Sequence, residues 1–152
     1  MVATGCAGDC AARGHLFWGE GVDAPPVLFL DTAGRGWEDS QPEGSESRAN
    51  DGEAEVVALR AKELLDAGLA PDALAVITPY AAQALRVRER ARALGVDDAV
   101  EIDTVDAFQG REKEAVLVSL VRSNAEGDIG FVRDLRRVNV AITRARRHLF
   151  VV

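Results

Sequence analysis

Three polar stretches of the sequence hold residue types that can bind phosphate. They are TPYAAQ (78–83), TVDAFQGREKE (104–114) and RDLRRVNVAITRARRHL (133–149). On a helix with about 100° per residue, Arg133, Arg137 and Arg144 of the third stretch would share one stripe. Guanidinium groups in such a stripe suit bidentate binding of phosphate oxygens. An arginine on a transferring phosphoryl group accelerates the transfer by roughly 10³ to 10⁵.

Each stretch also has an ordinary structural explanation. Thr78 and Pro79 can end a strand and begin a helix, because proline is favoured at the first helical position. Gln109 and Gly110 can form a simple turn, and an arginine-rich helix can be a solvated surface. None of the three stretches decides the function alone.

The elements that would position these stretches alternate between strands and helices. Short apolar runs predict strands at 27–31, 74–78, 100–104, 115–121 and 148–152. Helices are expected from Asn50 to Gly68, at about 80–94 and at about 133–146. This alternation predicts an α/β fold with a largely parallel sheet. Ligands gather at the carboxyl ends of such strands, where we expect all three polar stretches to lie.

Local signals refine these elements. Asn50 and Glu53 have the spacing of a capping box, and Gly68 ends the helix that follows. The segment 32–51 is rich in glycine and serine, and we expect a mobile loop. The helix at 133–146 is expected to pack on the core through four apolar residues: Leu135, Val138, Ile142 and Ala145.

Composition narrows the class of protein. The 152 residues are 47% hydrophobic and 28% charged, which is typical of one soluble globular domain. No apolar run approaches the roughly 18 to 20 residues that span a bilayer, and the first residues lack the features of a secretory signal. We therefore expect a cytoplasmic location without membrane contact. The net charge is −7, but residues 76–152 hold 13 basic and 11 acidic side chains.

A metal site is not expected. Cys6 and Cys10 have a C-x3-C spacing, but a site would need two further ligands, and His15 and His148 lie in unrelated contexts.

Taken together, the polar stretches resemble a known family. ITPYAAQ, TVDAFQGREKEAVLVSLVRSN and GFVRDLRRVNVAITRARRHL resemble motifs IV, V and VI of superfamily 1 helicases. They are most similar to the 5′-to-3′ branch that contains Upf-type and immunoglobulin-mu-binding-type enzymes. LFLDTAG, a polar loop and EAEVV also match the start of that group's second motor domain. The resemblance implies a RecA-like second helicase domain over residues 27–152 and leaves 1–26 as an irregular lead-in.

The resemblance implies a role for individual residues. Arg144 matches the arginine finger that reaches the γ-phosphate of ATP across a cleft between two motor domains. The turn that faces the nucleotide is matched by Gln109, Gly110, Arg111 and Glu112. Positions near the backbone of single-stranded DNA or RNA are matched by Thr78, Pro79, Tyr80 and Thr104. Threonine hydroxyls and backbone amides would bind the strand largely independently of its sequence.

One departure from the family limits these expectations. Neither Lys62 nor Lys113 closes a G-x4-G-K-[ST] phosphate loop, because Ala61 and Glu112 precede them. We therefore expect a first motor domain, in cis or in trans, to bind most of the ATP and Mg²⁺, and no ATP hydrolysis by this chain alone.

Two alternatives remain at this point. The chain could be a stand-alone, non-catalytic module that binds single-stranded nucleic acid. It could also be an α/β signalling domain with Asp31 as phosphate acceptor, although that design needs a strand-end lysine near the close of the sheet, which the sequence lacks.

Overall fold

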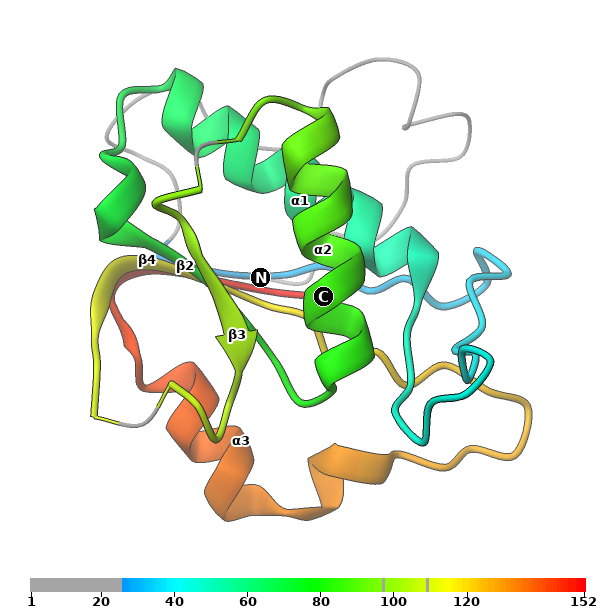
Figure 1. The fold of residues 1–152 in the computed structure, drawn as a ribbon. Helices are drawn as coiled ribbons and strands as arrows, with labels where there is room; N and C mark the ends of the chain where they lie inside the picture. Colours follow the sequence, from blue (N-terminus) through cyan, green and yellow to red (C-terminus); the bar gives the residue numbers. More distant parts are fainter. Residues whose placement is uncertain (1–25, 97, 109) are drawn as a thin grey trace.

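The computed structural model describes residues 26–96, 98–108 and 110–152, which form one sheet flanked by helices (Figure 1). The described strands are β1 (Val27–Phe29), β2 (Leu74–Thr78), β3 (Glu101–Thr104), β4 (Lys113–Val118) and β5 (Ala145–Val151). The α-helices are α1 (Asp51–Asp66), α2 (Ala81–Ala93) and α3 (Leu135–Ile142), and short 3-10 helices span Pro71–Ala73 and Gly130–Arg133. The irregular lead-in predicted for 1–26 lies almost wholly outside the described residues.

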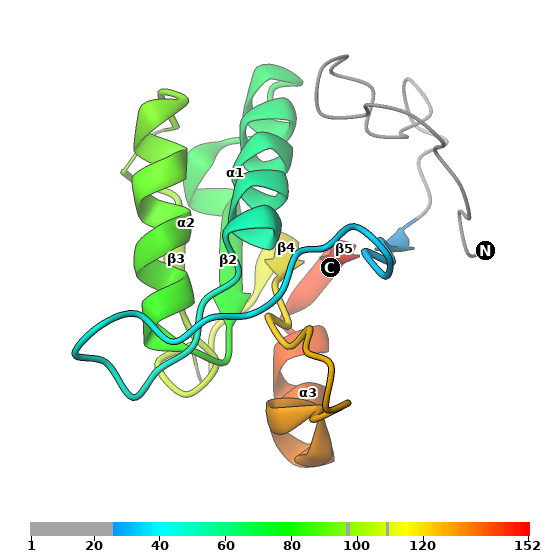
Figure 2. The ribbon, with the colours of Figure 1, turned by 90° about the vertical axis from the view of Figure 1, so that its right-hand side faces the viewer.

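The sheet is parallel throughout and has the strand order β1-β5-β4-β2-β3. Helices α1 and α2 cover one face, and α3 lies against the other (Figure 2). The predicted α/β class and parallel sheet are confirmed, and the architecture is that of a RecA-like domain.

The central strands are apolar because both of their faces are covered. Along β2, Leu74 and Val76 join the core beneath α1 and α2, whereas Ala75 and Ile77 join the core on the α3 side. All five residues of β2 are buried. Because side chains alternate along a strand, one short apolar run contributes residues to the cores on both faces of the sheet.

Helix α1 begins and ends where the sequence predicts, but the capping box is only half formed. Asn50 accepts a hydrogen bond from the Glu53 backbone N–H at 3.1 Å, and Gly68 has the positive φ, 96°, that ends the helix. The Glu53 carboxylate does not return to Asn50. Gln83 accepts the Asn50 N–H instead, at 2.8 Å, because Glu53 is bonded elsewhere in the core.

The predicted helix at 133–146 is wrong at both ends. Asp134 begins α3 by accepting from the backbone N–H groups of Arg136 and Arg137, and the helix stops after eight residues at Ile142. Strand β5 already begins at Ala145. Arg133 therefore precedes α3 and Arg144 follows it, so the predicted arginine stripe does not exist.

The predicted core face of this helix is correct for Val138 and Ala145, which pack against the core, and wrong for Leu135 and Ile142. Leu135 is 74% exposed and Ile142 is 39% exposed, while Val138 is partly buried. Ala141 is the buried residue of α3. A helix of two turns contacts the sheet along a narrow line, so the wide apolar face expected for a longer helix is not needed.

The segment between β1 and α1 is anchored, although the sequence indicated a mobile loop. Ser40 and Ala49 pair across it as an isolated antiparallel bridge. Asp39, next to Ser40, accepts a hydrogen bond from the Ser123 backbone N–H at 2.9 Å. This loop is therefore fixed at Asp39 to the segment that follows β4.

Strand β4 ends earlier than predicted. It stops at Val118, and Val121 has a φ of 75°, a left-handed conformation that is uncommon for a β-branched residue. The Val121 N–H donates to the Glu53 carboxylate at 2.8 Å, and the Val121 carbonyl accepts from Asn50 at 3.3 Å. These buried hydrogen bonds hold the turn that the strand pattern could not reveal.

Within the described residues, no helix combines the length and apolar character needed to cross a bilayer.

Candidate functional site

The structure places the predicted site residues at two opposite edges of the sheet. Thr78 and Thr104 face each other in register at the carboxyl ends of β2 and β3. Gly110, Arg111 and Glu112 precede β4, and Arg144 precedes β5, so they lie at the amino ends of parallel strands. The expectation that all three polar stretches lie at carboxyl ends is therefore wrong for these residues. We call the two regions the carboxyl edge and the amino edge.

Arg144 lies at the amino edge with its guanidinium group held only by neutral oxygens. It donates to the Val140 carbonyl at 3.0 Å, the Thr143 hydroxyl at 3.1 Å and the Arg111 carbonyl at 3.4 Å. It forms no ion pair with any residue that the structure describes. Its positive charge remains available to an anion, and its neighbour Arg111 belongs to the predicted nucleotide turn.

The other described residues of this turn are held by ion pairs and stacking. The Arg111 guanidinium lies 4.8 Å from the Phe108 ring centre and pairs with Glu101. Glu112 pairs with Arg146 at 3.3 Å, and both side chains are at least half exposed. Gly110 has a φ of 78°, which glycine adopts without strain. Gln109 lies outside the described residues.

Arg146 joins two acids at the amino edge. Its guanidinium group lies 3.3 Å from Glu112 and 3.5 Å from Glu114. The hydrogen bond with Glu112, followed by that with Glu114, raises the pKa of Arg146 above its ordinary value. Glu112 is therefore engaged within the chain, whereas Arg144 has no acidic partner among the described residues.

The carboxyl edge offers backbone atoms and one aromatic ring. Thr78 is fully buried, and its hydroxyl has no hydrogen-bond partner among the described residues, while its carbonyl accepts from Val105 N at 3.0 Å. Pro79 and Tyr80 are partly exposed. Thr104 is also partly exposed, and its hydroxyl accepts from Ala107 N at 3.4 Å.

Two segments connect the edges across the α3 face. Residues 104–112 run from the carboxyl edge to the amino edge, and α3 lies on the same face. They are joined by a two-pronged ion pair between Asp106 and Arg137, in which Arg137 Nε lies 3.1 Å from the carboxylate. Arg137 also lies 5.1 Å from the centre of the Phe131 ring. Arg137 was predicted to bind phosphate, but in the structure it links α3 to the segment 104–112.

A polar cluster beside the carboxyl edge was not predicted. We call it the Asp39 cluster; its members are Asp39, Arg48, Arg122, Ser123, Asn124 and Asp128. Burial would raise the pKa of Asp39, but hydrogen bonds from Asn124, Ser123 and Arg48 outweigh it and lower the pKa. Arg122, Ser123 and Asn124 belong to the VRSN run, which lies inside the stretch that resembles motif V. No sequence pattern indicates Asp39, because it lies in a polar loop.

Beneath the Asp39 cluster, the Glu53 side chain is buried and accepts two hydrogen bonds. Its carboxylate accepts from the Ser119 hydroxyl at 2.7 Å and from Val121 N at 2.8 Å, and it is 3% exposed. Gln83 donates to Ser119 at 2.9 Å. Burial raises the pKa of Glu53, and the hydrogen bonds from Ser119 and Val121 oppose that shift only in part.

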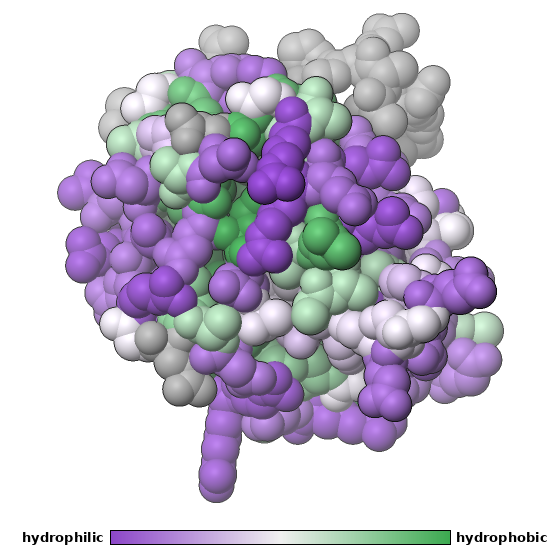
Figure 3. All heavy atoms as spheres, viewed as in Figure 1, coloured by the Kyte–Doolittle hydropathy of each residue, from purple (hydrophilic) through white to green (hydrophobic). Residues whose placement is uncertain are grey.

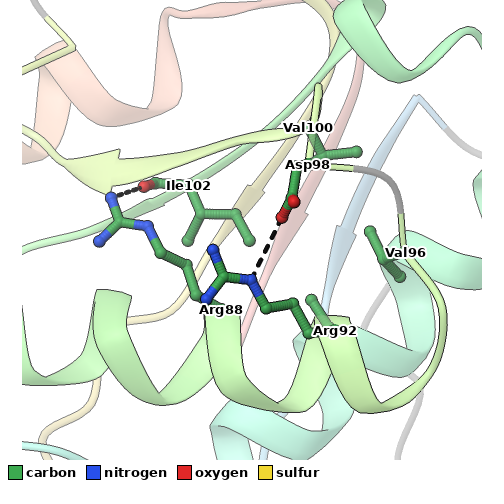
Figure 4. Close-up of a pocket in the computed structure, with 7 residues that line it drawn as sticks. Arg88, Arg92, Val96, Asp98, Val100 and Ile102 are labelled. Carbon is green, nitrogen blue, oxygen red and sulfur yellow. Dashed lines mark hydrogen bonds and ion pairs between the residues drawn. The ribbon is translucent and has the colours of Figure 1, made fainter.

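A cavity of about 290 Å³ lies away from these residues, between α2 and β3 (Figure 4). Its lining combines charged side chains with apolar ones, from Arg88, Ala91, Arg92, Val96, Asp98, Val100 and Ile102. Arg88 and Arg92 belong to α2. Arg88 donates to the Ile102 carbonyl, and Arg92 pairs with Asp98 at 3.2 Å. Hydrophilic side chains dominate this face of the molecule, with hydrophobic ones visible between them (Figure 3). The cavity shares no residue with either predicted site.

The described part of the chain contains no group of three histidine, cysteine, aspartate or glutamate side chains arranged to hold a metal ion. Cys6, Cys10 and His15 lie outside that part, and His148 is exposed on β5.

Comparison with known proteins agrees with the resemblance seen in the motifs. Residues 10–152 match the family model AAA_12, which describes an AAA domain. The DNA-binding protein SMUBP-2 of Mus musculus is 46% identical over 127 residues, which are 84% of this chain and 13% of that protein. The DNA polymerase alpha-associated DNA helicase A of Schizosaccharomyces pombe is 44% identical over 132 residues, 84% of this chain and 20% of that protein.

A third relative is the human DNA replication ATP-dependent helicase/nuclease DNA2, 39% identical over 139 residues, which are 89% of this chain and 13% of that protein. The chain thus spans between 13% and 20% of the length of these relatives. Two of the three are helicases by name, and the family model covers the whole described structure. The chain belongs to the AAA_12 family of AAA domains.

Proposed function

We propose that this chain acts as the C-terminal motor domain of a superfamily 1 helicase from the 5′-to-3′ branch that contains Upf-type enzymes. Residues 27–152 would form the motor domain, residues 1–26 a lead-in, and the protein would work in the cytoplasm on single-stranded DNA or RNA. The observation that carries the proposal is Arg144, whose guanidinium group touches the predicted nucleotide turn and has no acidic partner among the described residues.

The amino edge would be the nucleotide-facing side. Arg144 would stabilise the charge that develops on the transferred γ-phosphoryl group of ATP, because a planar guanidinium group can bind two phosphate oxygens at once. Gln109, Gly110, Arg111 and Glu112 would line the same side of the cleft. Release of Glu112 from Arg146 would free its carboxylate for contacts in the closed state.

A first motor domain is needed for the rest of the site. The sequence has no phosphate loop, and the acids at the amino edge, Glu112 and Glu114, are already paired with Arg146. The residues present therefore fit one side of an ATP site and do not fit a magnesium site. Mg²⁺ would neutralise phosphate charge from the side of the first motor domain.

The carboxyl edge would carry the nucleic-acid strand. Three partly exposed residues there would contact sugar and phosphate: Pro79, Tyr80 and Thr104. The buried Thr78 would position the backbone at the end of β2, opposite Thr104. The link between Asp106 and Arg137 joins this edge to α3, which leads into Arg144. Closure of the cleft would therefore move the strand contacts.

The test replaces Arg144 with alanine in an enzyme reconstituted from this chain and a first motor domain. Turnover of ATP should fall by about 10³ or more, the range expected for an arginine finger. Arg136→Ala is the matched control, because Arg136 is an exposed arginine of α3 without an ion pair to any described residue. A loss below about tenfold in Arg144→Ala would remove the finger assignment.

A second candidate is a stand-alone module that binds single strands without catalysis. The partly exposed Tyr80 and Thr104 at the carboxyl edge favour it, because contacts of this kind need no nucleotide. The same reconstitution separates the two: a module would bind single-stranded oligonucleotides yet leave the ATP turnover of a first motor domain unchanged.

A further inference from the structure

Tyr80 and Arg122 meet at the junction of the carboxyl edge and the Asp39 cluster. Tyr80 is the residue before α2, and Arg122 follows the turn at the end of β4. The Tyr80 hydroxyl lies beside the Arg122 guanidinium group, since both would border a Cβ atom at Gly130. Burial would lower the pKa of Arg122, but interaction with the Tyr80 hydroxyl and the charges of Asp39 and Asp128 outweigh it and raise the pKa. The Tyr80 ring packs in part against the core on the α3 side and remains partly exposed. Its orientation is therefore set at both the ring and the hydroxyl.

Arg122 is itself held firmly. Its side chain is 9% exposed and lies between two acids, with Nη2 2.9 Å from Asp128 and Nε 3.4 Å from Asp39. The Asp39 carboxylate is fully buried and also binds Arg48 at 2.8 Å. A guanidinium group with carboxylates on two sides has little freedom to rotate, so it can fix a third partner.

The backbone leaves room for this contact at one position. A Cβ atom at Gly130 would lie 2.6 Å from the Tyr80 hydroxyl oxygen and 3.0 Å from Arg122 Nη1. Gly130 also donates its N–H to Asp128 at 3.0 Å, and its φ is 47°. A side chain at position 130 would push the Tyr80 and Arg122 side chains aside, so glycine favours their contact.

We propose that Arg122 is a positioning residue for nucleic-acid binding, which holds the Tyr80 ring at the carboxyl edge in the orientation that receives the single strand. The proposal rests on the proposed function, because it assigns the strand to this edge. Arg122 acts through the Tyr80 hydroxyl and does not touch the strand. An aromatic ring fixed in advance binds a base or sugar without the entropy cost of ordering it.

Binding of a fluorescein-labelled oligothymidylate, measured by anisotropy at constant salt, tests the proposal with four variants. Tyr80→Phe removes only the hydroxyl, and Arg122→Gln removes the donor. Each should weaken binding about 3- to 10-fold, the value of one charge-assisted hydrogen bond. Arg48→Gln is the matched control: it removes the same charge and another Asp39 partner without touching Tyr80, and its effect should stay below about twofold.

The double variant Tyr80→Phe, Arg122→Gln decides whether the two residues act as a unit. Its affinity for the oligonucleotide should be no lower than that of the single variant that binds more weakly, because either change already breaks the contact. Losses that multiply, or an Arg122→Gln loss no larger than that of Arg48→Gln, would overturn the proposal. Thermal melting of each variant shows whether it folds. Tyr80→Phe leaves every ion pair intact and decides the case if Arg122→Gln does not fold.

The chain has a single tyrosine, which provides a readout that needs no nucleic acid. Ring-labelled tyrosine gives an NMR signal from Tyr80 alone. Arg122→Gln should shift and average that signal, whereas Arg48→Gln should leave it in place. An unchanged Tyr80 signal in Arg122→Gln would refute the positioning role. If the wild-type chain binds no oligonucleotide while the Tyr80 signal responds as expected, the proposed strand site fails and the positioning contact stands.

Discussion

The ion pair between Arg146 and Glu112 at the amino edge joins exposed side chains, whereas the carboxyl edge rests on buried hydrogen bonds. Arg146 and Glu112 are both at least half exposed, and Arg144 has only neutral partners among the described residues. Behind the carboxyl edge, Glu53 and Asp39 place their carboxylates in the interior. Breaking an exposed ion pair costs little free energy, because water solvates both groups, whereas breaking a buried one costs much more. The difference indicates a rearranging surface at one edge and a fixed one at the other.

The largest effect on stability is expected from Glu53→Ala. This change leaves the Ser119 hydroxyl and the Val121 N–H without an acceptor in the core, and should lower the free energy of unfolding by about 2 to 4 kcal/mol. Urea denaturation measures it. Glu55→Ala is the control, because Glu55 lies on the same helix and pairs with Arg90 at the surface. Equal losses in the two variants would contradict the distinction between buried and exposed acids.

A smaller and pH-dependent effect is expected from Glu53→Gln. Burial raises the pKa of Glu53 in the folded state above the ordinary value of 4.5. The protonated form therefore stabilises the fold fully below about pH 4.5, and this contribution is lost as the pH rises through the folded pKa. Glutamine keeps one oxygen acceptor and does not titrate.

Urea denaturation at several pH values compares the wild-type chain with Glu53→Gln. The stability of the variant relative to wild type should increase from about pH 4.5 toward neutral pH. A constant difference across that range would show that Glu53 does not titrate within it.

At the carboxyl edge, Thr104→Ala should weaken single-strand binding about fivefold and leave nucleotide binding by the reconstituted enzyme unchanged, because the hydroxyl lies at the proposed strand site. Anisotropy with labelled oligonucleotide and labelled nucleotide measures both. Thr143→Ala is the matched threonine at the amino edge, and its effect should be the reverse. If Thr104→Ala changes nucleotide binding more, Thr104 belongs to the other site.

The smallest effect is expected from Arg146→Gln. The side chain is 58% exposed and both of its acidic partners are at the surface, so the melting temperature should move by less than about 2 °C. Differential scanning calorimetry measures it. A shift comparable to that of Glu53→Ala would remove the contrast between the two edges.

The sequence predicts the elements with strong local signals. Strand β2 matches its predicted bounds because its apolar run is buried on both faces, and α1 starts and stops at Asn50 and Gly68 because each has a local chemical reason. The helix before Arg144 was predicted too long, because its apolar spacing continues into β5 without a break. Alternating polar and apolar residues fit either element over so short a span.

Long-range contacts were beyond local patterns. Glu53 reaches Ser119 and Val121, which are 66 and 68 positions away in the sequence, and spacing rules describe only neighbours within a turn or two. The same limit applies to Asp39, 84 positions from Ser123. The resemblance to helicase motifs is enough to name the described site residues. That they lie at two opposite edges depends on how the strands pair in the sheet.

The pairing of β1 with β5 has a consequence for folding. Among the described strands, β1 has β5 as its only neighbour, and Val27 lies opposite Leu149. During synthesis, β1 leaves the ribosome early and has no strand to pair with until β5 follows. Contacts so far apart in sequence close late and slowly. Val27 and Phe29, which are exposed even in the folded sheet, therefore have no strand partner until β5 has been made.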